Sequence, residues 1–462
     1  MKKLAVVWIV ILGFWAPNAS ADQVKYLARP EQSLAAFMAS IDRAQKSIDL
    51  ATFIFKPCDP STRILMEKLS ARARAGVKVR LLLDAFQQQD AKDNIVDDFA
   101  RSGVEVRYFS NSIFDINIRL HSKFMIVDGA TYIAGGRNLD DTYFGLSDHY
   151  NYVDRDVFVN GTSAREASRT FNELWVSKMA TPFHGDPNWF EEWDSFCHEK
   201  SAEEVHARMN QIKTFLARNT TAILASAPTR QCPSVAFKGD SPDFGSQAYG
   251  SEWKNGEGAK NYMTAGRLKR KRATEEVLRF VLSAQSSLFM ENWVYMPIES
   301  LEKAFAHLRS LKVPVDILTN SDMEEEGPDF FREAKEYAIF THSERDAVGT
   351  QKVGLVSSLG SLESSYALTP VNTPYFIHSK VGVRDGKDVI VGSFNLDSRS
   401  THTNLESVVS IKDCPELAGD VRAGGRQVRA AYEADEKSGE IPAKPEWSFL
   451  AKFLAELLIT EF

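Results

Sequence analysis

The sequence has few cysteines, and its apolar segments are short. Its four cysteines are Cys58, Cys197, Cys232 and Cys414, and none of them has the spacing of a metal site. They allow two disulfides, in any of three pairings, or four buried thiols, and the sequence leaves these alternatives open. The apolar run from Leu4 to Trp15 is shorter than the roughly 20 residues of a membrane-spanning helix. We therefore expect neither a cysteine-bound metal nor a membrane anchor.

The start of the chain has the pattern of an export signal. Lys2 and Lys3 precede the apolar run, and the small residues Ala19-Ser20-Ala21 follow it. This order is typical of a secretory signal peptide, which we expect to span residues 1–21 and to be cut before Asp22. No cysteine follows the small residues, so the pattern does not indicate a lipoprotein. We expect a mature protein in the periplasm or outside the cell, in peripheral contact with a membrane.

An excess of positive charge is also absent. Lys and Arg number 55 against 62 Asp and Glu, a formal net charge of −7 that loss of Lys2 and Lys3 makes more negative by two. Such a chain gains little from long-range attraction to DNA or to anionic lipid. The hydrophobic content of 44% is ordinary for a globular protein, and 462 residues predict more than one domain.

One polar motif occurs twice, with every member at the same offset from its histidine. The first copy contains His121, Lys123, Asp128, Gly135, Gly136 and Asn138, and the second contains His378, Lys380, Asp385, Gly392, Ser393 and Asn395. The step from His to Asp is 7 residues and the step from His to Asn is 17 residues in both copies. A pattern this strict, on two different apolar backgrounds, indicates a duplicated site and a duplicated domain.

Helical and strand patterns alternate ahead of each motif, which predicts an α/β fold with helices on both faces of a mixed sheet. We expect two similar α/β/α halves, packed about a pseudo-two-fold axis around one shared site. The predicted halves are residues 22–180 and 267–462. Residues 181–266 are rich in Gly, Pro, Asn and Ser and are interpreted as an irregular linker with insertions, and residues 322–374 as a second irregular stretch.

The repeated residues suit phosphoryl chemistry without a metal or another cofactor. In an extended segment, His and Lys two positions apart point to the same face, so each copy offers an imidazole beside an ammonium group. One imidazole can act as nucleophile while the other protonates the leaving alcohol and later serves as base. Two lysines and two asparagines, Lys123, Lys380, Asn138 and Asn395, can stabilise the developing charge on the phosphate oxygens.

Other residues are expected to support this site. A nucleophilic imidazole needs its second nitrogen held, and Asp156 and Glu406 stand at similar places after the two motifs. Asp128 and Asp385 lie in Asp-Gly pairs between strands, so we expect them to fix hairpin turns. The motif's small residues, Gly135, Gly136, Gly392 and Ser393, should permit a close approach of backbone and substrate.

The two motifs resemble the signature of the phospholipase D superfamily, which single-chain members carry twice. Gly135-Gly136-Arg137-Asn138 with Tyr143-Phe144, and the run from Gly392 to Ser400, are similar to bacterial cardiolipin synthases, especially their C-type branch. The resemblance implies two phospholipase D-like halves, a phosphohistidine intermediate, no metal, and a phosphodiester substrate. By analogy with single-chain members, it implies that His121 is the nucleophile and His378 the acid and base.

These observations favour a phospholipid enzyme. We expect it to pass a phosphatidyl group to an alcohol, giving cardiolipin, or to water, giving phosphatidic acid, and to work as a monomer. A nuclease of the same superfamily is the alternative, which the acidic chain disfavours. A third reading is an inactive lipid-binding or nucleic-acid-binding protein, and it is disfavoured because both copies of the motif are complete.

Overall fold

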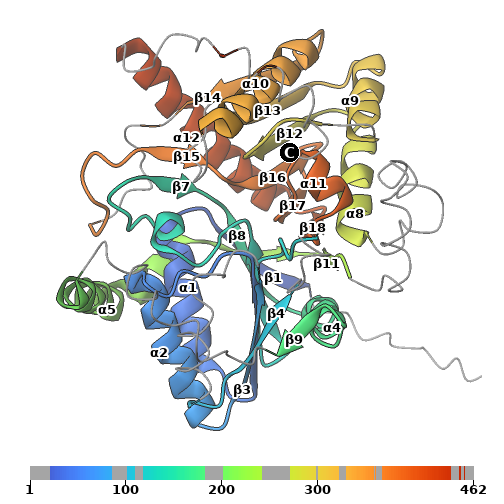
Figure 1. The fold of residues 1–462 in the computed structure, drawn as a ribbon. Coiled ribbons are helices and arrows are strands. Elements are labelled where there is room, and N and C mark those ends of the chain that lie inside the picture. The colour runs from blue at the N-terminus through green and yellow to red at the C-terminus, as the bar shows by residue number, and fades with distance from the viewer. Residues whose placement is uncertain are drawn as a thin grey trace, which may run out of the picture.

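The computed structural model describes residues 21–85, 101–109, 118–182, 201–241, 271–297, 300–321, 329–357, 359, 367–438, 447–448 and 452. The expected signal peptide up to residue 20 and the residue Cys197 lie outside these ranges. The described chain folds into two α/β halves, one below the other in Figure 1.

The N-terminal half is built on a nine-stranded sheet. Its strand order is β10 (Thr229–Cys232), β1 (Asp22–Leu27), β8 (Asp156–Asn160), β6 (Thr131–Gly135), β5 (Phe124–Val127), β2 (Ser47–Thr52), β3 (Lys78–Asp84), β4 (Glu105–Phe109) and β9 (Ala180–Pro182). Three helices cover one face and share a core with it: α1 (Pro30–Arg43), α2 (Pro60–Arg74) and α5 (Ala202–Ser226). Helix α4 (Ala164–Trp175) packs on the other face (Figure 1).

The C-terminal half repeats this plan on seven strands. Their order is β11 (Ser234–Gly239), β18 (Ser407–Lys412), β17 (Asp388–Gly392), β16 (Lys380–Arg384), β12 (Leu288–Asn292), β13 (Val315–Asn320) and β14 (Gln351–Val356). Helices α8 (Arg272–Leu282) and α9 (Ser300–Ser310) cover one face, and α12 (Pro415–Ser438) packs against the other. In both halves three parallel strands lie next to an antiparallel meander, β2-β3-β4 beside β5-β6-β8 and β12-β13-β14 beside β16-β17-β18. This confirms the predicted fold of two similar α/β halves.

Strands from both halves meet at the interface. Strand β7 (Asn151–Val153) pairs in parallel with β15 (Tyr375–Ile377), and a single bridge joins Leu120 to Leu405. One hydrophobic core continues from the N-terminal sheet into the C-terminal sheet and α12. The chain crosses between the sheets at Pro233, because β10 belongs to one sheet and β11 to the other.

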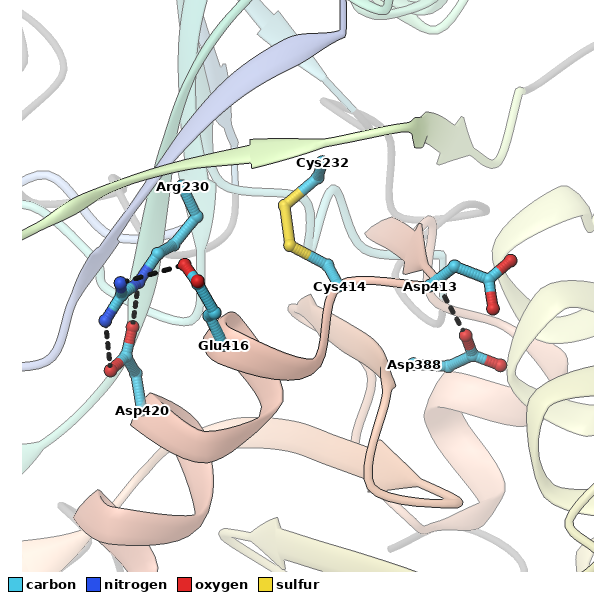
Figure 2. Close-up of a disulfide and its surroundings, with 7 residues drawn as sticks. All are labelled: Arg230, Cys232, Asp388, Asp413, Cys414, Glu416 and Asp420. Atoms are coloured by element: carbon cyan, nitrogen blue, oxygen red, sulfur yellow. Dashed lines mark hydrogen bonds and ion pairs between the residues drawn. A yellow bond between two sulfur atoms is a disulfide. The ribbon is translucent and has the colours of Figure 1, made fainter.

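A disulfide between Cys232 and Cys414 joins this crossing to the start of α12 (Figure 2). Beside it, Arg230 on β10 pairs with Asp420 at 2.9 Å and with Glu416 at 3.0 Å, both on α12. Cys58 is disulfide-bonded as well, so none of the three cysteines in the described ranges is free. Of the alternatives that the sequence left open, buried free thiols are therefore wrong.

The two stretches predicted to be irregular contain regular elements. Residues 181–266 include the 25-residue helix α5, which begins with a capping box between Ser201 and Glu204 and buries Met209 and Ile212 against α1 and α2. Residues 322–374 include α10 (Asp329–Asp346) and β14. The polar and small residues around these elements hid their helical and strand periodicity. Within the described ranges, no helix combines the length and the apolar character needed to cross a bilayer.

Candidate active site

The pairing between halves brings each motif histidine next to the other half. Backbone N–H groups of His378 and Ser379 donate to the carbonyl of Val153 at 2.8 and 3.1 Å, directly after the β7/β15 pair. On the other side, the N–H of His121 donates to the carbonyl of Leu405 at 3.0 Å. Because the residues after Val153 and Leu405 are acidic, both histidines stand opposite a carboxylate.

Each histidine is held by a carboxylate of the opposite half. Nδ1 of His121 lies 2.9 Å from both carboxylate oxygens of Glu406, and Nδ1 of His378 lies 2.6 Å from Oδ2 of Asp154. Both imidazoles are about 95% buried, and both carboxylates are fully buried. A carboxylate at Nδ1 assigns the proton to Nδ1, and Nε2 is left with the lone pair that a nucleophile or base needs.

The prediction was right for Glu406 and wrong for Asp156. Strand register explains the error: Gly135 of β6 lies opposite Asp156, whereas Gly392 of β17 lies opposite Val408. The equivalent of Glu406 is therefore two residues before Asp156, which is Asp154.

Asp156 instead belongs to a buried ion pair. Its carboxylate lies 2.9 Å from Nη1 of Arg137 and accepts a hydrogen bond from Ser33 at 2.7 Å. The Arg137 guanidinium also donates to the backbone carbonyls of Tyr143, at 3.2 Å, and of Asp154. The second half has Phe394 and Val408 at the positions of Arg137 and Asp156, and both lie in its apolar core. The ion pair thus supports the surroundings of His378 alone.

The two lysines lie against their own histidines. Nζ of Lys123 donates to the carbonyl of His121 at 2.6 Å, and Nζ of Lys380 lies 3.0 and 3.2 Å from the two ring nitrogens of His378. Among the described residues, neither lysine has a carboxylate within ion-pair distance. Burial lowers the pKa of Lys380 to about 8, and it lowers the pKa of Lys123 well below the usual range.

Burial also keeps both imidazoles neutral. It lowers the pKa of His121 to about 4, although Glu406 opposes the shift, and the charge of Lys123 adds to it. Burial and the charge of Lys380 lower the pKa of His378 well below its usual range. Glu406 stays ionised, since His121 and a hydrogen bond from Ser393 bring its pKa to about 2 against the effect of burial.

The side-chain amides of the two motif asparagines differ in their hydrogen bonds. Oδ1 of Asn138 accepts a hydrogen bond from the N–H of Ile54 at 3.2 Å, and its Nδ2 donates to the hydroxyl of Tyr143 at 2.8 Å. In the described structure, Oδ1 of Asn395 is buried without a partner. The difference follows from the strand β12. Val294 holds the position in the second half that Ile54 holds in the first, but its N–H donates to Asn292 at 3.3 Å and not to Asn395.

Aromatic residues that sequence reasoning missed pack on the histidines. Phe53 lies 5.0 Å from His121 and Trp293 lies 5.1 Å from His378, measured between ring centroids. They hold equivalent positions, directly after β2 and β12. Tyr143 and Tyr152 also contact His378, at 4.8 and 5.0 Å. The sequence contained one signal for Phe53 and Trp293, which is that both lie near the end of a predicted strand. Strand ends at the same edge of a sheet surround the same site.

Asp128 and Asp385 have the structural role that was expected. Each occupies the left-handed region, with φ of 55° and 52°, in the turn between two strands. The Asp128 carboxylate accepts the backbone N–H groups of residues 45–47, and Asp385 accepts those of residues 285–287. These hydrogen bonds lower the pKa of both carboxyl groups despite partial burial.

The motif's small residues make room for the carboxylates and for neighbouring backbone. A Cβ on Gly136 would lie 2.2 Å from Oδ1 of Asp154, and one on Gly392 would lie 2.2 Å from the carbonyl of Ser407. A Cβ on Gly135 would lie 2.3 Å from the carbonyl of Arg155. Ser393 stands where the first motif has Gly136, and its hydroxyl donates to Glu406.

The arrangement provides two neutral imidazoles and two lysine amino groups without carboxylate partners. It suits an anion with oxygens to be bound and one atom to be attacked. In the part of the chain that the structure describes, no three His, Cys, Asp or Glu side chains are grouped as metal ligands. Independence from metals stays a prediction.

Comparison with known proteins gives consistent matches. A family model described as cardiolipin synthase, phospholipase D-like domain, matches residues 37–175 and 277–423. Cardiolipin synthase C of Escherichia coli (strain K12) is 25% identical over 408 residues, which cover 81% of this chain and 79% of that protein. An uncharacterized protein of Helicobacter pylori is 27% identical over 416 residues, covering 83% and 74%. The crystal structure of phosphatidylserine synthase from Haemophilus influenzae has the same fold, with a TM-score of 0.61, 14% identity and 95% coverage of both chains.

Substitution of the two neighbouring aspartates should separate their roles. We expect Asp154→Asn to change the nitrogen NMR shifts of the His378 ring, because it replaces the acceptor at Nδ1. Asp156→Asn should leave that ring unchanged and lower the free energy of unfolding by about 3–5 kcal/mol, because Arg137 stays buried without its ion pair. Denaturant unfolding measures the second effect. A His378 ring perturbed by Asp156→Asn alone would contradict the assignment.

Anion binding should weaken as pH rises through about 8, where Lys380 loses its proton. The pKa of this lysine is lowered, so its positive charge is present below about pH 8 and absent above it. Dimethyl phosphate, which stays a monoanion across this range, is a suitable ligand for calorimetry between pH 6 and 10. Lys380→Arg keeps its charge and should lose less affinity over the same range. If the natural sequence bound dimethyl phosphate with equal affinity at pH 6 and at pH 10, the proposed role of the Lys380 charge in anion binding would be contradicted.

Proposed function

This chain belongs to the cardiolipin synthase, phospholipase D-like family, and we propose that it transfers a phosphatidyl group through a phosphohistidine at His121. The family confirms the predicted class of enzyme, a phosphatidyltransferase or phosphodiesterase acting on phospholipids. The observation that carries the finer proposal is the pair of neutral imidazoles, each fixed at Nδ1 by a carboxylate of the opposite half.

In the first step, Nε2 of His121 attacks the phosphorus and the bond to the leaving alcohol breaks. The leaving oxygen takes a proton from Nε2 of His378, which therefore has to be protonated beforehand. Substrate binding favours this proton, because the negative phosphodiester offsets the lysine charges that lower the pKa of His378. Glu406 stabilises the positive charge that develops on the His121 ring as the new bond forms.

In the second step, the acceptor hydroxyl gives its proton to Nε2 of His378 and its oxygen attacks the phosphorus. The bond between phosphorus and His121 breaks, and its electron pair returns to Nε2. Lys123, Lys380 and Asn395 are proposed to stabilise the phosphate oxygens in both steps, since they have donors that no carboxylate occupies. An alcohol acceptor gives a transferred phosphatidyl group, and water gives phosphatidic acid.

The contacts of the two histidines support the assignment of roles. Nε2 of His378 lies 3.2 Å from the hydroxyl of Tyr143, whereas Nε2 of His121 has no hydrogen-bond partner among the described residues. A nucleophile requires a free lone pair, and an acid and base requires a partner that exchanges protons with it. His121 fits the first requirement and His378 the second.

The proposed reaction predicts specific lipid products. We expect the mature protein, incubated with phosphatidylglycerol and phosphatidylethanolamine vesicles and a chelator, to form cardiolipin or phosphatidic acid, detected by mass spectrometry. His378→Ala should lower turnover by about 10²- to 10⁴-fold through loss of the acid and base. His121→Ala should abolish it, and substitution of the exposed His149 should not affect it.

Other outcomes separate the alternatives. Activity that the chelator removes and a divalent ion restores would contradict the metal-free mechanism. Cleavage of plasmid DNA without any lipid turnover would favour the nuclease. The absence of both activities would favour a binding protein. Since one chain supplies both histidines, we expect the active preparation to be a monomer by light scattering and to sediment with vesicles.

Export is proposed from the N-terminal pattern and is supported by the disulfide between Cys232 and Cys414, because disulfides persist in oxidising compartments. Expression in a Gram-negative host should give a periplasmic or secreted protein whose intact mass starts at Asp22 and includes the disulfide. A full-length reduced protein in the cytoplasm would contradict this proposal.

A further inference from the structure

Tyr143 forms a hydrogen-bonded link between the two motifs. Its hydroxyl lies 2.8 Å from Nδ2 of Asn138 and 3.2 Å from Nε2 of His378. The amide of Asn138 donates to the phenolic oxygen, so the hydroxyl hydrogen is free to point at Nε2. With Nδ1 of His378 donating to Asp154, Nε2 is the acceptor, and Nζ of Lys380 also lies 3.2 Å from it. The hydroxyl therefore sits on the atom that has to accept a proton in the second step.

The other half has no such group. The position 22 residues after its histidine, which corresponds to Tyr143, is Ser400. The Ser400 hydroxyl donates to Glu406 at 2.7 Å and accepts the N–H of Asn395 at 3.0 Å, so it supports the carboxylate. The tyrosine is thus specific to the His378 side of the site.

The surroundings hold Tyr143 firmly in this position. It lies in the short 3₁₀ helix η3 (Asp141–Phe144), whose first turn is capped by the side chain of Asp140. Its carbonyl accepts a hydrogen bond from Arg137, and its ring lies 4.8 Å from that of Tyr152. The residue is 3% exposed. While this buried hydroxyl makes its hydrogen bonds to Asn138 and His378, a water molecule cannot make them.

We propose that the Tyr143 hydroxyl occupies the place of the acceptor hydroxyl and thereby favours transfer to an alcohol over hydrolysis. This inference rests on the proposed phosphatidyl transfer. In the second step the acceptor oxygen has to give its hydrogen to Nε2 of His378, and Nδ2 of Asn138 is a donor to that oxygen. The phenol makes both of these hydrogen bonds itself.

The discrimination follows from what each acceptor gains by displacing the phenol. Water makes at best the same two hydrogen bonds, so it gains little from displacing a group that is already in place. A lipid alcohol brings further binding energy from its remote parts, which offsets the displacement. Without the hydroxyl, a water with two polar partners can occupy the site. It would then give its proton to His378 while its oxygen attacks the phosphorus, and the bond to His121 would break.

The test is the ratio of phosphatidic acid to cardiolipin formed from phosphatidylglycerol vesicles. Tyr143→Phe should raise this ratio about three- to tenfold, the range expected from one net hydrogen bond. The matched control is Tyr132→Phe, which removes another buried tyrosine hydroxyl, one that is hydrogen-bonded to Ser163 at 3.1 Å and not to a residue of the site. It should leave the ratio unchanged. The ratio does not depend on the fraction of folded enzyme, so a purely structural effect would not alter it.

Each outcome decides the inference. An unchanged ratio in active Tyr143→Phe, or an equal loss of both products, would overturn it and leave the proposed function intact. An equal rise in Tyr132→Phe would also overturn it. If Tyr143→Phe does not fold, Tyr143→Leu opens the same space and should raise the ratio. If the natural sequence forms neither product, the proposed function fails, and the inference fails with it.

Discussion

The two hydrogen bonds between histidine and carboxylate across the interface are the interaction on which the rest of the structure depends. Each joins one half to the other, and each is almost completely buried. A buried carboxylate without its partner is costly, so neither half alone holds a satisfied site. Closing the interface and orienting the imidazoles are therefore the same event. The continuous apolar core, the β7/β15 pair and the disulfide at the crossing all stabilise that closed arrangement.

A duplicated fold produces two equivalent halves, whereas the proposed two-step transfer needs two histidines with different tasks. The structure resolves this conflict through a few substitutions at equivalent positions. Arg137 with Asp156 is replaced by Phe394 with Val408, and Tyr143 is replaced by Ser400. Thr52 is replaced by Asn292, which frees the amide oxygen of Asn395. The strand register stays the same while the contacts of the two rings diverge.

The sequence predicted the fold and the central residues because both depend on spacing. Two identical offsets from histidine to lysine and asparagine require the same strand-turn-strand geometry twice. It could not distinguish Asp154 from Asp156, because the answer depends on which residue lies opposite Gly135 in β8. Phe53, Trp293 and Tyr143 were missed as site residues, since an aromatic residue near a strand end is more often part of the core. Their role appears only when the halves are placed together.

The charges around the two histidines explain why the site is suited to an anion. Glu406 and Asp154 direct their oxygens to the imidazoles and to hydroxyl or backbone donors, so neither pairs with a lysine. Lys123 and Lys380 donate only to backbone carbonyls and to a histidine ring in the described structure. Burial makes their positive charge costly, and this cost lowers their pKa. A phosphodiester entering the site supplies the missing negative charge, which offsets this cost. In the proposed reaction, the electrostatic cost of the buried lysines thereby becomes binding energy for the substrate, and the same negative charge favours the proton on His378 that the first step needs.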